Sequence, residues 1–288
     1  MDSSPPLLSI ITINYNHKNG LKKTFDSIFN QTWQDFEYIV IDGGSKDGSK
    51  ELIEANKDRI DYWVSEPDNG VYNAMNNGIR VANGDYVLFL NGGDFLYNDE
   101  VLCSVFDSIS DTSVPIYSCK LLRKSNVLEE VIEPNEKLNF LFFSRGGSLP
   151  HPSTFIKKSL FEKYFYYNED LKIVSDWEFF FYVIGFGNEK VEYLNTILSV
   201  FMMDGISTNP KNIKLKEDEI KSVLKNRFSF FSSGLEKYIK LGYDLYNNQL
   251  VLINRRKNSS ILRKIQSFLL LIASKLQDVK SKKANFFS

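Results

Sequence analysis

The sequence has 288 residues, which is enough for one large α/β domain or for such a domain with an extension. Hydrophobic residues make up 43% of the chain and can fill a packed core, while the formal net charge of −1 gives no overall attraction for nucleic acid. The two cysteines have no metal-ligand spacing, so we expect neither a zinc site nor a disulfide framework and predict a reducing, cytoplasmic environment.

The first hundred residues alternate strand and helix signals. Continuous apolar runs rich in β-branched and aromatic residues predict strands at 7–13, 36–41, 60–64 and 86–90. Apolar residues at helical spacing predict helices between them, at about 21–29, 49–56 and 71–82. This alternation is typical of βαβ units, so we predict an α/β fold with a mostly parallel central sheet flanked by helices.

Beyond residue 110 the pattern is less regular. Strands are predicted at 116–122 and 127–132, and helices at 160–164 and 175–184. From about residue 212 the chain is predicted to be helical to its end, and residues 255–288 carry nine Lys or Arg against one acidic residue. The C-terminal part is therefore predicted to be a helical, basic extension.

Polar segments follow the predicted strands of the first half, at residues 14–16, 42–45, 66–70 and 91–94. In parallel α/β sheets, ligands bind beyond the carboxyl ends of the strands. We therefore expect these four segments to converge on one crevice.

Several blocks of the sequence resemble family-2 glycosyltransferases: residues 8–16, 27–32, 36–48 and 82–94, with a weaker similarity at 151–181. The resemblance implies a GT-A fold with a Rossmann-like sheet, and an inverting transfer of a hexosyl or N-acetylhexosaminyl group from a nucleoside diphosphate sugar. It also implies a divalent metal, Mn²⁺ or Mg²⁺. The catalytic domain is then expected at 1–211, where 1–110 bind the nucleotide sugar and 111–211 face the acceptor, and the helical extension at 212–288.

The resemblance places the donor base and ribose beside the first two strands. The ring of Tyr15 offers a stacking face, and the carboxylate of Asp42 can accept a hydrogen bond from a base N–H. Alternatively, Asp42 only caps the helix that follows Gly48, and Tyr15 is an ordinary loop aromatic. The predicted nucleotide-sugar residues are Thr12, Tyr15, Asn16, Asp42, Asp68, Asn91 and Gly92.

Asp94 is the predicted metal ligand. It follows a buried strand and two glycines, which let the backbone approach a ligand closely. Its carboxylate is a hard oxygen ligand for Mg²⁺ or Mn²⁺, which would bridge the diphosphate oxygens. Asn91 and Gly93 stand where the family has acidic residues, so we expect weaker metal binding, helped by Asn91 or a distant side chain, and metal independence stays open. The alternative is an Asp in an ordinary Asx turn.

Asp68 precedes the helix predicted at 71–82. We expect it to cap this helix by accepting hydrogen bonds from the first unpaired N–H groups. The resemblance adds that the helix N-terminus faces the diphosphate or the sugar, and a helix N-terminus is a natural anion site. Both roles can hold together.

The acceptor side is predicted around residues 175–178. An inverting transfer needs a carboxylate that takes the proton of the attacking hydroxyl, and by resemblance Asp176 is this base, with Glu178 as second choice. The alternative is an acid that only interacts with the helix dipole. Trp177 begins an aromatic platform on which a sugar stacks. His151 lies near the acceptor or metal, or is a buried structural histidine, and His17 is expected to be solvent-exposed.

These features together predict an enzyme that glycosylates a glycan or a lipid-linked acceptor, in the synthesis of a bacterial surface polysaccharide such as capsule, O-antigen or exopolysaccharide. The N-terminus has no signal-peptide pattern, and no apolar run is long enough to span a bilayer. The basic extension predicts peripheral attachment to the anionic inner face of the cytoplasmic membrane. Its alternatives are a homodimerisation helix and a solvated helix packed on the domain.

Two other classes of protein compete with this prediction. A nucleotidyltransferase needs a glycine-rich, basic phosphate loop directly after the first strand, and residues 14–16 lack it. A non-catalytic carbohydrate- or nucleotide-binding derivative of the fold stays open, because acidic residues are missing at Asn91 and Gly93.

Overall fold

A computed structural model describes residues 6–125, 127–134, 138–203, 205 and 208–228. The chain divides into two compact units, Met1–Arg227 and Phe228–Ser288, and all described helices and strands belong to the first. Within those ranges, no helix is long and apolar enough to cross a membrane. The helices predicted at 229–288, with their basic residues, lie outside the described residues.

Four parallel strands form the first half of the sheet, in the order β3-β2-β1-β4. They are β1 (Leu8–Asn14), β2 (Phe36–Asp42), β3 (Tyr62–Ser65) and β4 (Tyr86–Phe89). The helices between them are α1 (Lys18–Phe29), α2 (Ser49–Ala55) with the short η1 (Lys57–Arg59), and α3 (Val71–Val81). This order confirms the predicted alternation of strands and helices. The apolar runs of β1 and β4 are buried along their whole length, as expected of strands inside a parallel sheet.

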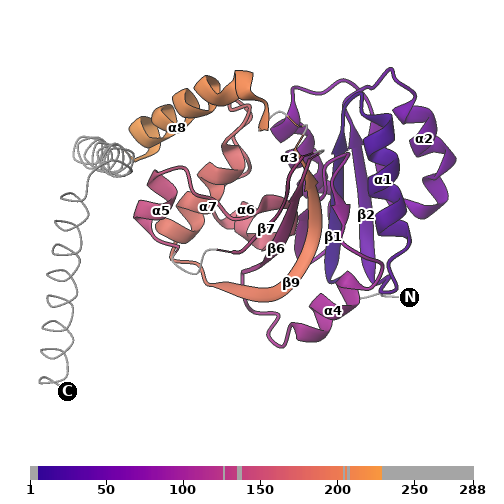
Figure 1. The fold of residues 1–288 in the computed structure, drawn as a ribbon, viewed down its shortest axis with the longest axis horizontal. Helices are drawn as coiled ribbons and strands as arrows, with labels where there is room; N and C mark the ends of the chain where they lie inside the picture. The colour runs from indigo at the N-terminus through magenta and orange to yellow at the C-terminus, as the bar shows by residue number, and fades with distance from the viewer. Residues whose placement is uncertain (1–5, 126, 135–137, 204, 206–207, 229–288) are drawn as a thin grey trace, which may run out of the picture. The chain divides into compact units, whose positions relative to one another are not determined.

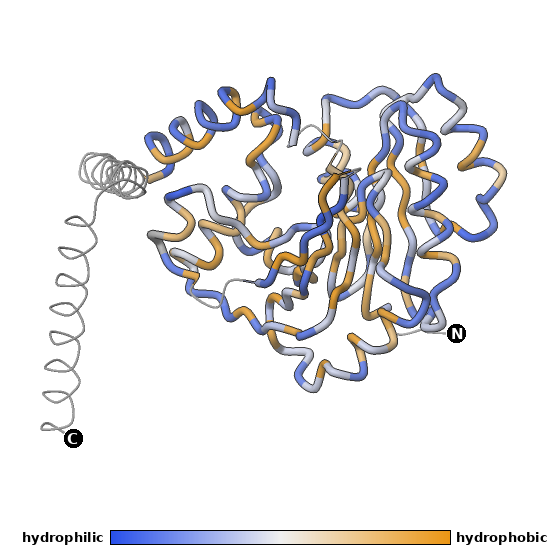
Figure 2. The backbone as a smooth tube through the Cα atoms, viewed as in Figure 1, coloured by the Kyte–Doolittle hydropathy of each residue, from blue (hydrophilic) through white to orange (hydrophobic). Residues whose placement is uncertain are grey.

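Helices cover both faces of this parallel half (Figure 1). On the face of α1 and α2, Phe25 packs on Tyr38 of β2 with 5.9 Å between ring centroids. On the face of α3, Gly78 approaches β1 so closely that a Cβ at this residue would stand 2.5 Å from Ile11 Cγ2. Figure 2 shows that hydrophobic residues concentrate along the strands. The polar residues Asn14 and Asp42 are the last residues of β1 and β2.

The second half of the sheet pairs its strands in both directions, in the order β8-β6-β9-β5, with β7 on β6. The strands are β5 (Phe95–Leu96), β6 (Ile116–Lys124), β7 (Glu129–Ile132), β8 (Thr154–Lys157) and β9 (Val191–Met202). β6 and β7 confirm the strands predicted at 116–122 and 127–132. β9 was not predicted, because Asn195 and Thr196 interrupt its apolar pattern.

Short helices complete the unit. They are α4 (Val101–Ser108), α5 (Phe140–Ser144), η2 (His151–Ser153), α6 (Ser159–Lys163), α7 (Ser175–Gly185), η4 (Pro210–Asn212) and α8 (Ile213–Arg227). α6 and α7 confirm the helices predicted at 160–164 and 175–184. Glu219 of α8 accepts hydrogen bonds from the backbone N–H groups of Lys172 and Ile173, at 2.8 and 3.0 Å. These bonds tie α8 to the segment before α7. The domain boundary predicted at residue 211 stays a prediction.

The substitution Gly78→Ala tests the packing of α3 on β1. The added methyl would meet Ile11 Cγ2, a methyl group of a fully buried residue of β1, so we expect the free energy of unfolding to fall by about 1–3 kcal/mol. Chemical denaturation measures this loss. Gly205→Ala is the control, because nothing lies within 4 Å of its Cβ position. Equal stabilities of the two variants would contradict the close approach.

Candidate active site

Side-chain hydrogen bonds join the carboxyl ends of β1, β2 and β3. Asn14 pairs with Asp42 in the parallel register, and Asn14 Nδ2 donates to Asp42 Oδ1 at 2.8 Å. The backbone N–H of Ser45 and the hydroxyl of Ser65 donate to Asp42 Oδ2 at 2.9 and 2.7 Å, and Ser45 Oγ donates to Oδ1 at 2.5 Å. Asp42 is fully buried. It does not cap α2, which follows Gly48 without a side-chain cap.

The other residues predicted beside the base and ribose form a buried and an exposed group. Thr12 is buried and accepts a hydrogen bond from Tyr38 Oη at 3.0 Å. Tyr15 is 67% exposed. Asn16 has a φ of +49° and is bonded to residues 45 and 46 through its own N–H and its side-chain oxygen. The structure therefore gathers these residues at one edge of the sheet, and their contact with a donor stays a prediction.

Residues 91–94 form a tight turn after β4, called the 91–94 turn below. Gly93 has a φ of +112°, a conformation that favours glycine. A Cβ at Gly92 would lie 2.6 Å from Asn14 Oδ1, so this position also requires glycine. The N–H of Gly92 donates to the carbonyl of Ile13 at 2.9 Å and fixes the turn to the end of β1.

His17 holds the same turn from the start of α1. Its Nδ1 donates to the carbonyl of Gly92 at 2.8 Å, which assigns the proton to Nδ1 because a carbonyl oxygen only accepts. The ring is half-buried, so the expectation that His17 is solvent-exposed is wrong. Its Cε1 lies 2.8 Å from the Cβ position of Gly93. In this arrangement the imidazole and a side chain at residue 93 exclude each other.

Asp94 and Asn91 carry the side-chain oxygen atoms of the turn. Asp94 is buried, and its Oδ1 accepts a long hydrogen bond, 3.3 Å, from the N–H of Met202 at the end of β9. Asn91 Oδ1 is buried and has no hydrogen-bond partner among the described residues. Among all the residues that the structure describes, no three or more His, Cys, Asp or Glu side chains are grouped so that they could hold a metal ion. Asp94 and Asn91 are therefore the described side chains of the turn that could contribute oxygen ligands to a cation.

Asp68 was expected to be the N-cap of α3, and this expectation is wrong. The N-cap is Gly70, with a φ of +112° and no side-chain cap. Asp68 Oδ1 accepts a hydrogen bond from the N–H of Gly70 at 2.8 Å, and its Oδ2 lies 2.7 Å from the Cβ position of Gly43. The carboxylate therefore closes the loop at 66–70 and packs it on the turn after β2.

Asp176 lies in the first turn of α7 and is hydrogen-bonded to α3. Tyr72, in the first turn of α3, donates its phenol proton to Asp176 Oδ1 at 2.8 Å. Because α3 begins beyond the carboxyl end of β3, this bond brings Asp176 to the edge of the sheet at which Asn14 and Asp42 lie. The predicted base is thus close to the predicted donor residues.

Two residues predicted on the acceptor side are buried. His151 Nε2 and Tyr167 Oη are hydrogen-bonded at 2.8 Å, the imidazole stacks on Phe89, and burial lowers the pKa of His151. These contacts agree with the alternative of a structural histidine.

Trp177 is 4% exposed, and its Nε1 donates to the carbonyl of Phe143 at 2.9 Å. The expectation that a sugar stacks on Trp177 is therefore wrong, since the ring is packed inside the domain.

Glu178, the second choice for the base, anchors α8. Its side chain is 3% exposed, and its Oε1 accepts a hydrogen bond from Arg227 Nε at 2.6 Å. The guanidinium of Arg227 also lies over the ring of Phe165, 4.0 Å from its centroid. Residues two apart on a helix point to different sides, so Glu178 is turned away from the side of Asp176. This geometry favours Asp176 over Glu178 at the crevice.

Sequence reasoning missed His17 and Tyr72, which bond to residues of the candidate site, and Arg227, which anchors α8 on α7. The position of His17 directly after a polar strand end was a usable signal. Tyr72 and Arg227 gave none, because their partners are 104 and 49 residues away in the sequence.

The family model described as "Glycosyl transferase family 2" matches residues 9–165, more than half of the chain. A Mycobacterium tuberculosis protein described as an uncharacterized glycosyltransferase is 33% identical over 180 residues, which cover 62% of this chain and 68% of that protein. A PGL/p-HBAD biosynthesis glycosyltransferase of Mycobacterium bovis is 31% identical over 179 residues, 60% of this chain and 68% of that protein. The chain belongs to glycosyl transferase family 2.

Solved structures agree with this assignment at the level of the fold. Staphylococcus aureus TarS 1–349 in complex with UDP-GlcNAc matches with a TM-score of 0.60 at 18% identity, over 76% of this chain and 66% of that chain. The mannosyltransferase PcManGT from Pyrobaculum calidifontis, in complex with GDP-Man and Mn²⁺, matches with a TM-score of 0.58 at 15% identity, over 94% and 83%. The predicted GT-A fold is confirmed.

The substitution Arg227→Ala tests the anchor between α7 and α8. It leaves the buried carboxylate of Glu178 without its cation, so we expect the free energy of unfolding to fall by about 2 kcal/mol or more. Lys225→Ala, on the same helical turn and exposed, is the control and is expected to change stability by less than about 0.5 kcal/mol.

A second change separates charge from packing in the same measurement. Glu178→Gln in the Arg227→Ala background should recover part of the loss, because a neutral amide is less costly to bury than a carboxylate. The ion-pair account fails if Arg227→Ala and Lys225→Ala unfold at the same denaturant concentration.

Proposed function

We propose that this protein transfers a sugar from a nucleoside diphosphate sugar to a hydroxyl group of a glycan or lipid-linked acceptor, with inversion at the anomeric carbon. The observation that carries the proposal is the hydrogen bond between Tyr72 and Asp176. It brings a carboxylate from α7 to the strand edge that also bears Asn14, Asp42 and the 91–94 turn. A carboxylate beside a donor site is what a single displacement by a hydroxyl requires.

Exposed and buried residues contribute to donor binding in different ways in this proposal. Tyr15, with its ring largely exposed, stacks on the base, and Asn16 lies beside it. Thr12 and Asp42 line the floor of the base and ribose site. Asp42 already accepts four hydrogen bonds, so a base N–H reaches it only if a hydroxyl of Ser45 or Ser65 turns away. Asp68, Asn91 and Gly92 lie toward the diphosphate and the sugar.

The 91–94 turn fits a divalent cation of the hard type. The carboxylate of Asp94 and the unpartnered amide oxygen of Asn91 are ligands that suit Mg²⁺ or Mn²⁺. When bound, such a cation acts as a Lewis acid on the diphosphate leaving group. One solved structure of the same fold was obtained with Mn²⁺, in PcManGT.

The chain's own residues carry the proton transfer. The acceptor hydroxyl oxygen forms a bond to the anomeric carbon while the bond from that carbon to the diphosphate breaks, and the nucleoside diphosphate leaves. Asp176 takes the hydroxyl proton on its carboxylate as the new bond forms. Inversion follows, because attack and departure occur on opposite faces of the sugar.

The class of acceptor is proposed from the relatives. One of them is described by its role in PGL/p-HBAD biosynthesis, which supports a surface glycan or lipid-linked acceptor in a bacterium. UDP-GlcNAc and GDP-Man in the related structures support a hexosyl or N-acetylhexosaminyl donor. Attachment of the basic residues at 255–288 to the inner face of the cytoplasmic membrane is consistent with such an acceptor.

A panel of sugar nucleotides tests donor use. Incubation with UDP-GlcNAc, GDP-Man and their relatives, with Mn²⁺, is expected to release a nucleoside diphosphate from at least one donor. Asp94→Ala should reduce this release to background and remove any response to Mn²⁺, whereas the exposed Asp99→Ala should behave as the wild type. Full activity of Asp94→Ala would move the metal elsewhere. Binding of nucleoside diphosphates without release from any donor would indicate a non-catalytic member of the family.

The isosteric substitution Asp176→Asn tests the base. It removes the proton acceptor without changing the shape of the side chain, so turnover is expected to fall about 100-fold or more. Nucleoside diphosphate affinity, measured by calorimetry, should change less than about twofold, because the base acts on the acceptor. A loss of donor affinity with unchanged turnover would remove Asp176 from the base role.

A further inference from the structure

Tyr72 is buried between α3 and α7, and its hydroxyl has one described partner, the carboxylate of Asp176. Burial raises the pKa of Tyr72 well above its usual range, and the adjacent carboxylate raises it further. The phenol therefore stays protonated and is the donor in this bond. Asp176 is only half-buried, so the rest of its carboxylate is accessible.

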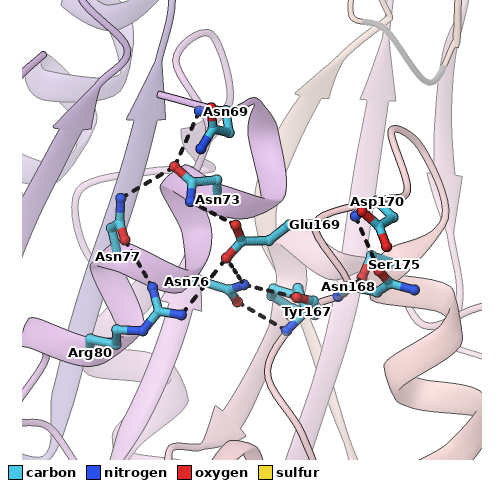
Figure 3. A network of polar contacts seen from close by, with 10 residues as sticks. All are labelled: Asn69, Asn73, Asn76, Asn77, Arg80, Tyr167, Asn168, Glu169, Asp170 and Ser175. Atoms are coloured by element: carbon cyan, nitrogen blue, oxygen red, sulfur yellow. Dashed lines mark hydrogen bonds and ion pairs between the residues drawn. The ribbon is translucent and has the colours of Figure 1, made fainter. Parts of the chain in front are cut away.

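The segment before Asp176 is held by the same helix. The side-chain amide of Asn76, almost fully buried, donates to the carbonyl of Tyr167 at 2.8 Å and accepts from its N–H at 3.0 Å. Glu169 accepts hydrogen bonds from Asn73 and Asn76 at 2.7 and 2.8 Å. Figure 3 shows these side chains of α3 reaching across to the segment at 167–175.

This network leads from the donor side of the site to the base. α3 follows directly after the loop at 66–70, which Asp68 packs on the turn after β2. Its first two turns carry Tyr72, Asn73 and Asn76, which all bond to the segment of the base or to the base itself. The position of Asp176 is therefore set by α3 as well as by α7.

We propose that Tyr72 is a positioning residue for the base: its hydroxyl holds Asp176 Oδ1 and so presents Oδ2 to the attacking hydroxyl. This inference rests on the proposed function, in which Asp176 takes a proton. Tyr72 itself touches neither substrate nor metal in this account. Its effect is on turnover, through the orientation of one carboxylate.

Tyr72→Phe removes the hydroxyl and keeps the ring. The probe reaction is hydrolysis of UDP-GlcNAc or GDP-Man with Mn²⁺, in which water replaces the acceptor. We expect turnover at saturating donor to fall about tenfold or more, with KM for the donor unchanged within about twofold. Tyr86→Phe is the matched control, because Tyr86 is equally buried and its hydroxyl donates to the carbonyls of Thr112 and Val114, at the other end of β4.

A double substitution decides whether Tyr72 acts through Asp176. Tyr72→Phe should cause no further loss of turnover in the Asp176→Asn background, because nothing is left to position. Wild-type turnover in Tyr72→Phe, a rise in donor KM alone, or a further loss in the double variant would each overturn the proposal. If Asp176→Asn hydrolyses donor like the wild type, the base assignment of the proposed function fails instead.

A crystal structure of Tyr72→Phe gives an answer that needs no turnover. The proposal predicts that the Asp176 side chain leaves the rotamer bound to Tyr72 or occupies more than one rotamer. A single, unchanged rotamer would overturn it, even if neither donor is hydrolysed by the wild type.

Discussion

The parallel register of β1 with β2 is the constraint on which the rest of the site depends. It sets Asn14 beside Asp42, and it leaves the carbonyl of Ile13 free to accept the N–H of Gly92. A slip of one residue would turn every side chain of β1 to the opposite face and separate the amide from the carboxylate. The apolar residues that bury β1 on both faces therefore also determine the polar geometry at its end. The crowding that results at the 91–94 turn, from Asn14 on one side and His17 on the other, requires glycine at both central positions.

Helix α3 connects the two halves of the candidate site. It is fixed on β1 through Gly78, and its first turns bond to Asp176 and to the segment before it. The carboxylate of Asp176 is thereby held by a helix that is packed directly on the parallel half of the sheet. The second half of the sheet contributes from the other direction, since the N–H of Met202 at the end of β9 reaches Asp94. The site is assembled from the ends of β1, β2, β3, β4 and β9 and from the first turns of α3 and α7.

The sequence predicts the first half of the fold well because the signals there are local. Each apolar run of β1 to β4 ends in polar residues, and the edge where they meet follows from parallel pairing alone. In the second half, β6 and β7 were predicted from their own apolar runs, but β9 was missed because Asn195 and Thr196 interrupt its pattern and its pairing with β6 leaves no local signal. The same limit applies to the site residues: Asp94 and Asp176 were predicted from their motifs and their roles stay predictions, whereas Tyr72, which bonds across 104 residues, left no local signal. Trp177 was misjudged, because an aromatic side chain next to an acid has the same pattern whether it faces a ligand or the core.

The proposed function requires the carboxyl edge of β1, β2 and β4 to bind the nucleoside diphosphate of a sugar donor. A crystal structure with UDP or GDP and Mn²⁺ tests it most directly. The account predicts a base beside Tyr15 and a diphosphate at the 91–94 turn, with the cation within bonding distance of Asp94. A nucleotide bound at the amino ends of these strands, or a diphosphate remote from Asp94, would contradict it.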